Sequence, residues 1–130
     1  KHNFTYSLLP HKGDFREAGV IEEAYNLNSP ARTVAVEGFS SLSAPFKVQG
    51  RGAIPEATKM SEDQEDMLVI RLYEAWGREV STEISFDFEP QTVYELNSIE
   101  EKQKEVLVEN SAAEIFFGAF EIKTIGVIPS

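Results

Sequence analysis

The stretch MLVIRLYEAWGREVSTEISFDFE, residues 67–89, decides the fold that the sequence predicts. Its first part, Met67 to Ala75, is almost continuously apolar, which is typical of a strand buried on both faces. After Trp76 and Gly77, residues 80–89 alternate with a period of two, which predicts a strand with one face in water. The positions expected to face inward are Val80, Thr82, Ile84, Phe86 and Phe88.

Short extended runs lie on both sides of this pair, separated by turn residues roughly every ten positions. Pro55 places the run 53–60 at a sheet edge, because proline cannot donate to a ladder. We therefore predict an all-β protein, an antiparallel β-sandwich of the immunoglobulin-like type over residues 31–130, with one N-terminal helix. The other expected strands are 34–39 (Val34, Val36, Phe39), 46–48, 93–94, 106–108, 115–117 and 120–128, with Pro90 forming a turn and Gly118 a bend.

Residues 1–30 are predicted to form a strand followed by the helix. Phe4, Tyr6 and Leu8 alternate in FTYSLLP, and Pro10 ends the strand. Asp14 and Glu17 have the spacing of a capping box, which predicts a helix that begins at Asp14. The apolar stripe of this helix is Val20, Ile21, Ala24 and Leu27, and Asn28 and Pro30 end it.

Composition excludes several classes of function. The 130 residues contain 12 Lys and Arg against 22 Asp and Glu, so the formal net charge is −10. An acidic surface repels phosphate backbones and anionic lipids, so we expect neither nucleic-acid nor membrane partners. The sequence has no cysteine, which fits a reducing compartment and predicts a cytoplasmic protein. Because the chain opens with Lys1 and enters a strand-like run, we expect an excised fragment without a signal peptide.

Two groups of residues are candidates for a binding site. His11, Lys12, Asp14 and Arg16 form a polar cluster that could bind an anion at a helix N-terminus. A capped turn whose charges pair locally is the favoured interpretation of the same residues. Trp76 and Tyr94, with Tyr73 near them in sequence, could stack on a sugar, although aromatic side chains in a sandwich more often belong to the core.

Other polar residues give weaker signals. The acidic loop 61–66, SEDQED, could hold calcium but lacks the glycine and final glutamate of a calcium loop, so a solvated hairpin tip is favoured. His2 and His11 are too far apart along an extended segment to share a zinc ion. Glu74 is expected to be partly buried and paired with Arg71 or Arg78. We identify no catalytic residue and no metal ligand.

Three motifs in order resemble the C-terminal region of glycoside hydrolase family 38 α-mannosidases, in the form of the cytosolic and bacterial branch. They are FTYSLLPHKGDFREAGVIEEAYNLN (4–28), SEDQEDMLVIRLYEAWG (61–77) and FEIKTIGV (120–127). The resemblance implies a parent enzyme that hydrolyses terminal α-mannosides with retention, using zinc or another divalent metal and a catalytic Asp in an N-terminal barrel. The metal-ligand and catalytic motifs of that barrel are absent from this sequence. The resemblance therefore implies no cofactor in this chain. Residues 1–30 would form the junction with a middle β-domain.

The leading hypothesis is a non-catalytic sandwich domain that packs against the catalytic and middle domains of the same polypeptide and stabilises them. The alternatives are a carbohydrate-binding module for mannose-containing oligosaccharides and a free-standing scaffold sandwich. The fragment hypothesis predicts an exposed apolar patch that includes some of Phe4, Tyr6, Leu8 and Phe15, covered by the missing domain or by self-association.

Overall fold

The computed structural model describes residues 2–29, 31–33, 35, 37–38 and 43–130. The chain forms two compact units, Lys1–Ser41 and Leu42–Ser130. The strand expected at Val34, Val36 and Phe39 falls on residues outside the described part of the chain. Among the described residues, no helix is long and apolar enough to cross a membrane.

The helix of the first unit is α1 (Val20–Asn28), so the predicted start at Asp14 is wrong. The N-cap is Gly19, which has a left-handed backbone with φ 67° and gives no side-chain cap. The Asp14 carboxylate instead accepts the N–H groups of Arg16 and Glu17 at 2.9 and 3.1 Å. Asp14 therefore caps a separate turn, and Gly19 divides this turn from the helix because glycine adopts positive φ without strain.

The strand predicted over Phe4, Tyr6 and Leu8 is also wrong, because residues 2–10 carry no strand hydrogen bonding in the structure. Alternating apolar and polar side chains suit a strand in a sheet. A strand forms, however, only where a neighbouring strand provides the backbone hydrogen bonds. The exposure predicted for these side chains is confirmed: Phe4, Tyr6 and Leu8 are 83%, 77% and 86% exposed and Phe15 is 41% exposed. α1 likewise has no buried residue.

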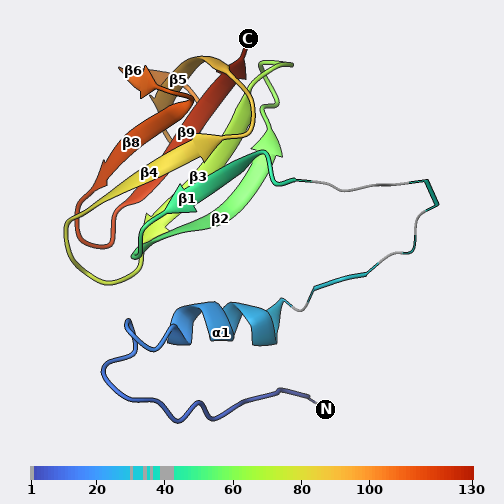
Figure 1. Ribbon diagram of the computed structural model, residues 1–130, viewed down its shortest axis with the longest axis vertical. Coiled ribbons are helices and arrows are strands. Elements are labelled where there is room, and N and C mark those ends of the chain that lie inside the picture. The colour runs from blue at the N-terminus through green and yellow to red at the C-terminus, as the bar shows by residue number, and fades with distance from the viewer. Residues whose placement is uncertain (1, 30, 34, 36, 39–42) are drawn as a thin grey trace. The chain divides into compact units, whose positions relative to one another are not determined.

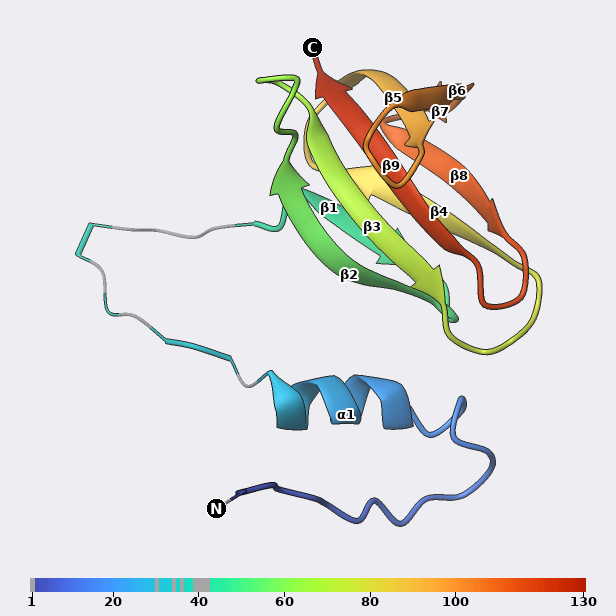
Figure 2. The ribbon, with the colours of Figure 1, turned by 180° about the vertical axis from the view of Figure 1, so that it is seen from behind.

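The second unit confirms the antiparallel β-sandwich (Figure 1). One sheet has the strand order β1-β4-β8-β7 and the other the order β2-β3-β9-β5-β6. Figure 2 shows the five-stranded sheet from its outer side. The strands are β1 (Phe46–Gln49), β2 (Ala53–Met60), β3 (Leu68–Glu74), β4 (Val80–Phe86), β5 (Pro90–Leu96), β6 (Lys102–Val106), β7 (Val108–Glu109), β8 (Ala112–Phe117) and β9 (Ile122–Pro129).

The core lies between the two sheets and follows the predicted patterns. β3 is an interior strand between β2 and β9, and Ile70 and Leu72 are fully buried. β4 lies between β1 and β8 and buries Thr82, Ile84 and Phe86 while Ser81 and Glu83 face water. Several bounds differ from the predictions. β4 ends at Phe86 rather than Glu89, and Pro90 begins β5 instead of forming a turn. The strand expected over 106–108 is divided between β6 and β7, and the strand expected over 120–128 begins only at Ile122, because Phe120 has a left-handed backbone.

The edge position of β2 is confirmed, and its pairing with β3 shifts register between Pro55 and Ala57. This shift occurs beside the proline because Pro55 has no N–H to give to the ladder. The edge strand therefore bends where its hydrogen bonding is interrupted.

A second apolar cluster, Met67, Val69 and Leu96, covers the outer face of the five-stranded sheet, with Tyr94 and Ile128 packed against it.

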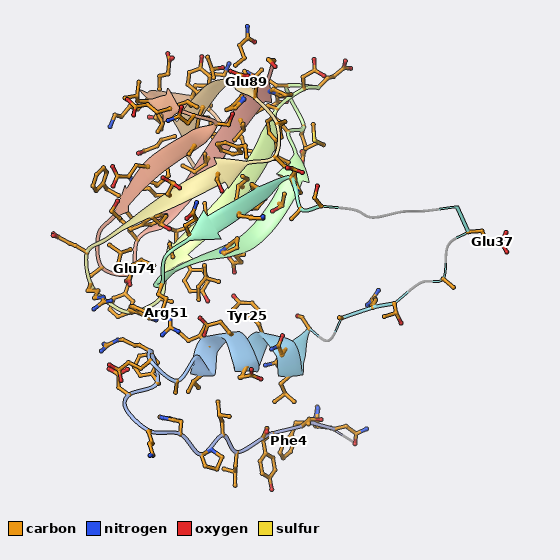
Figure 3. All side chains as sticks on the ribbon, in the orientation of Figure 1. Phe4, Tyr25, Glu37, Arg51, Glu74 and Glu89 are labelled. Carbon is orange, nitrogen blue, oxygen red and sulfur yellow. The ribbon has the colours of Figure 1, made fainter. Side chains whose placement is uncertain are left out.

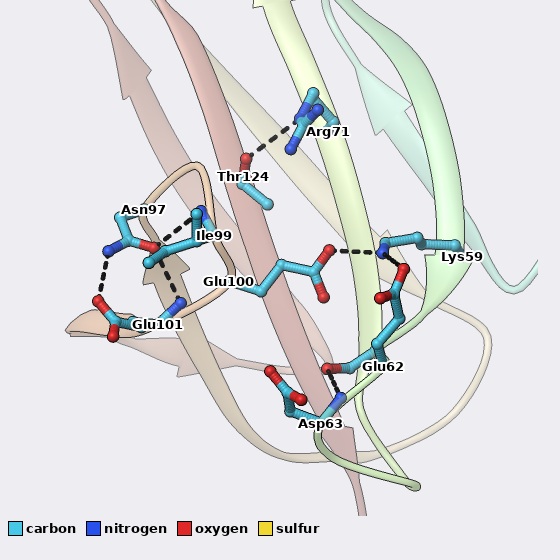
Figure 4. A network of polar contacts seen from close by, with 10 residues as sticks. Lys59, Glu62, Asp63, Arg71, Asn97, Ile99, Glu100, Glu101 and Thr124 are labelled. Carbon is cyan, nitrogen blue, oxygen red and sulfur yellow. Dashed lines mark hydrogen bonds and ion pairs between the residues drawn. The ribbon is translucent and has the colours of Figure 1, made fainter.

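The β5–β6 loop joins this face to the edge strand β2, as Figure 4 shows. Glu100 in this loop forms an ion pair of 2.7 Å with Lys59 of β2. The hydrogen bond from Lys59 is the main cause that lowers the pKa of Glu100, and the same bond raises the pKa of Lys59.

Candidate functional site

The most highly organised polar group of the sandwich lies where the β3–β4 loop meets the β8–β9 turn. Glu74 ends β3 with its side chain 1% exposed, at the end of the sandwich marked in Figure 3. Its carboxylate accepts four backbone N–H groups, which we call the Glu74 network. They belong to Trp76 at 2.7 Å, Gly77 at 2.7 Å, Arg78 at 3.2 Å and Phe120 at 2.9 Å.

The Glu74 network corrects the expected ion pair with Arg71 or Arg78. Arg78 contributes its backbone N–H rather than its guanidinium, and Arg71 bonds to Thr124 at 3.4 Å. Burial raises the pKa of Glu74, but the hydrogen bonds, led by that from Phe120, together hold this pKa below its ordinary value. An ionised carboxylate that accepts hydrogen bonds from protein N–H groups has few acceptor positions left for a ligand. Its role here is structural, because it joins the two loops.

Phe120, which donates one of these bonds, has an unusual conformation. Its φ is +58° and its ring lies against Gly77, where an added Cβ would be 2.5 Å from the ring Cζ. Gly77 itself has φ +70°. The ring thus occupies space that a side chain at position 77 would need. Phe120 itself is held in the left-handed region, although the residue is 72% exposed.

The predicted polar cluster lies in the capped turn before α1. Asp14 pairs with Arg16 at 3.3 Å, and the Arg16 guanidinium lies 4.9 Å from the Phe15 ring centre. The hydrogen bond from the Glu17 N–H is the largest cause that lowers the pKa of Asp14. His11 and Lys12 are exposed, and the His11 ring lies near the Lys12 carbonyl at 3.4 Å. These contacts are those of a locally paired turn, and the anion site stays a prediction.

The structure does not bring Trp76 and Tyr94 together. Trp76 is 8% exposed and its ring is covered by Arg78 at 4.5 Å. Tyr94 packs on the outer face of the five-stranded sheet, under Lys102 at 4.6 Å. Tyr94 aligns through Gly126 with Val69, and Trp76 follows seven residues later along the chain. The two residues therefore lie at opposite ends of β3, whose stretch from Val69 to Glu74 alone spans roughly 16 Å at the strand rise.

Within residues 2–29 and 43–130 and the few described positions between them, no three His, Asp or Glu side chains are placed to hold a metal ion. This includes the acidic loop 61–66, where Glu62 pairs with Lys59 at 3.1 Å. The residues present do not fit the divalent metal that the resemblance implies for a parent enzyme.

A hollow of about 730 Å³ lies on the side of the sandwich where the chain passes from β6 to β7. Five glutamates line it together with Lys104 and the exposed side chains of Leu107 and Phe116. Glu95 is paired with Lys123 at 3.1 Å. Glu83 and Glu114 bond to the neutral donors Gln49 and Ser81. A surface with this excess of carboxylates repels anions. The glutamates are Glu83, Glu95, Glu105, Glu109 and Glu114.

Glu83 and Glu114 are direct cross-strand partners in the β4–β8 pair, and like charges opposite each other destabilise a sheet. Glu114→Gln keeps an acceptor for Ser81 and removes the repulsion, so we expect the melting temperature of the chain to rise by roughly 1–3 °C. Glu56→Gln on β2, also exposed, removes one charge without a facing carboxylate and is the matched control. Equal melting temperatures for the two variants in calorimetry would contradict this account.

Comparisons with known proteins agree on one family. The sequence profile described as the glycosyl hydrolases family 38 C-terminal beta sandwich domain matches residues 52–125. This range begins just before β2 and ends within β9, so it lies inside the sandwich. The described N-terminal helix lies outside the matched range.

Three similar proteins are all named alpha-mannosidases. The chain is 32% identical to mouse alpha-mannosidase 2C1 over 131 residues, covering 96% of this chain and 13% of the relative. It is 44% identical to human alpha-mannosidase 2C1 over 85 residues, covering 62% of this chain and 8% of the relative. It is 27% identical to alpha-mannosidase G of Dictyostelium discoideum over 134 residues, 98% of this chain and 12% of the relative. The chain thus spans about an eighth or less of each relative.

Proposed function

The chain belongs to the family of glycosyl hydrolase family 38 C-terminal β-sandwich domains, and on that premise we propose that it is the non-catalytic C-terminal sandwich of an α-mannosidase. The observation that carries the proposal is the family match across the sandwich. The chain also spans only about an eighth of two relatives, so most of such a polypeptide lies outside it. In this proposal the parent polypeptide hydrolyses terminal α-mannosides with a divalent metal held outside these 130 residues.

We propose further that the domain packs against the rest of that polypeptide and stabilises it. Two features support this role. Large apolar side chains are exposed in both units, among them Phe4 and Leu8 in the first and Phe116 and Phe120 in the second. The sandwich also has a continuous core of its own, so it can act as a rigid body against which other domains pack.

The catalytic part of the proposal predicts that the isolated chain does not turn over an aryl α-mannoside in the presence of zinc. The reason is that family 38 chemistry needs a nucleophilic carboxylate beside a metal, and the described residues provide no such metal group. Release of the aryl alcohol is followed by absorbance, with the complete polypeptide as positive control. Turnover by the chain above a blank would refute the non-catalytic role.

The stabilising part is tested by removing the sandwich from the complete polypeptide after residue 41, the boundary between the two units. We expect the shortened polypeptide to lose α-mannosidase activity several times faster during heating, because an apolar interface is then exposed to water. Equal inactivation half-lives would contradict a stabilising role. The carbohydrate-binding alternative and the cytoplasmic location stay predictions, and titration with mannose oligosaccharides tests the former.

A further inference from the structure

Phe120 is a bulky, exposed residue that the β8–β9 turn holds in the left-handed region. A bulky residue at positive φ is rare, because its Cβ crowds the following carbonyl group. Residues kept in such conformations are held there by the surrounding structure and cluster at functional sites. Phe120 has φ +58°, yet the residue is 72% exposed, so core packing does not explain the conformation.

The surrounding structure fixes Phe120 at two points. The buried Glu74 carboxylate accepts its N–H at 2.9 Å, which fixes the backbone to the end of β3. The Cζ end of the ring lies against the Gly77 backbone, where a Cβ would be 2.5 Å from Cζ and 2.9 Å from Cε2. Phe120 is thus held at its N–H and at the Cζ end of its ring while the residue stays 72% exposed, which is a pre-organised arrangement for contact with another apolar surface.

The neighbourhood of Phe120 continues this apolar surface. Ile122, two residues later, is 64% exposed. A shallow hollow of about 420 Å³ includes Phe116 and Phe117 of β8 and Gly118 and Glu121 of the β8–β9 turn that also carries Phe120. Glu79 borders the same hollow. Exposed aromatic side chains on and beside this turn, with the carboxylates of Glu79 and Glu121 at the hollow, have the character of an interface centre with a polar rim.

We propose that Phe120 is a docking anchor, and that its occupant is an apolar pocket on the remaining part of the same polypeptide. This inference rests on the proposed function, and it names the contact through which the sandwich stabilises its parent. The relatives extend far beyond this chain, which covers 13% and 12% of two of them, so most of such a polypeptide is available as partner. A second copy is disfavoured as occupant because each chain carries a net charge of −10. The receiving pocket is expected to carry Lys or Arg at its rim, facing Glu79.

Phe120→Gly tests the anchor, because glycine keeps the N–H for Glu74 and adopts positive φ without strain. In the isolated chain we expect an unchanged or higher melting temperature. In the complete polypeptide we expect the half-life of α-mannosidase activity during heating to fall at least threefold. Phe120→Leu retains an apolar side chain and should recover part of this loss. Asn110→Gly, at another left-handed position with φ 51°, is the matched control and should leave both measurements unchanged.

The outcomes separate the anchor from the proposed function. If Phe120→Gly leaves the half-life unchanged while removal of the sandwich shortens it, the anchor is refuted and the stabilising role stands. If removal of the sandwich also has no effect, the proposed function fails. An equal loss of stability in the isolated chain would make Phe120 a structural residue and refute the anchor. A dimer of the isolated chain in light scattering that Phe120→Gly converts to monomer would assign the surface to a second copy.

Discussion

Replacing Glu74 by alanine is expected to lower the free energy of unfolding by about 4 kcal/mol, the largest loss for any single polar side chain of the sandwich. The change leaves four N–H groups without their acceptor, and the carboxylate is 1% exposed, so water cannot easily replace it. Hydrogen bonds to a charged group contribute about 1.5–3 kcal/mol each, and partial relaxation of the two loops reduces the sum. Small domains have only about 5–15 kcal/mol in total.

Denaturant unfolding of the isolated chain measures this loss. Glu79→Ala changes an exposed glutamate in the same loop and should alter the free energy of unfolding by about 0.5 kcal/mol or less. A loss for Glu74→Ala as small as that of this control would show that the Glu74 network adds nothing to stability.

The pH dependence of unfolding provides a second test of the Glu74 network. Because the folded state holds the pKa of Glu74 below its ordinary value, the contribution of this group is complete above the unfolded pKa of about 4.3. It is lost as the pH falls through the lower pKa of the folded state. Glu74→Gln should therefore show a shallower loss of stability below pH 4 than the unchanged chain. Parallel acid profiles for the two proteins would contradict the assignment.

Gly126→Ala is expected to cost about 2 kcal/mol, because it inserts a methyl group into a filled space. Gly126 lies in β9 between Val69 of β3 and Tyr94 of β5. An added Cβ would be 2.7 Å from Met67 Sδ and 2.9 Å from Leu96 Cδ1. Both side chains are buried in one cluster, so they can move only by disturbing each other.

Gly118→Ala is the control for this substitution, since a Cβ there makes only an ordinary contact of 3.6 Å with Glu121. We expect this variant to stay within about 0.5 kcal/mol of the unchanged chain in urea unfolding. Combining Gly126→Ala with Leu96→Ala should cost less than the sum of the two single changes, because the second change opens space for the first. Additive losses would contradict the packing argument.

The sequence predicted the sandwich because its strands bury alternate side chains or whole runs. Residues 80–86 alternate as the single wet face of β4 requires. Residues 68–74 are mostly apolar because β3 lies inside its sheet. The same alternation at Phe4, Tyr6 and Leu8 produced no strand. A periodic pattern reports which side chains suit a sheet but not whether a neighbouring strand is present.

The errors at Asp14 and Glu74 share a physical cause. The spacing of Asp14 and Glu17 predicted a helix start, but the carboxylate caps a single turn and the left-handed Gly19 delays the helix. For Glu74 the sequence offered nearby arginines as partners, whereas the structure uses backbone N–H groups. Backbone donors are present at every residue, so only the path of the chain shows which of them converge. The position of Phe120, 46 residues away, carries no sequence signal of this contact.

The interrupted ladder of β2 also bears on how the molecule behaves at high concentration. Open sheet edges invite strands from other molecules, which is the route by which β-proteins aggregate. Here Pro55 and its register shift break the free edge of β2, and Glu100 holds Lys59 farther along the same strand. At the opposite borders β6 carries Lys102 and Lys104, and β1 and β7 have four and two residues. The borders of both sheets are thus short, charged or broken, so growth of intermolecular β-structure from the folded domain is blocked at its first step.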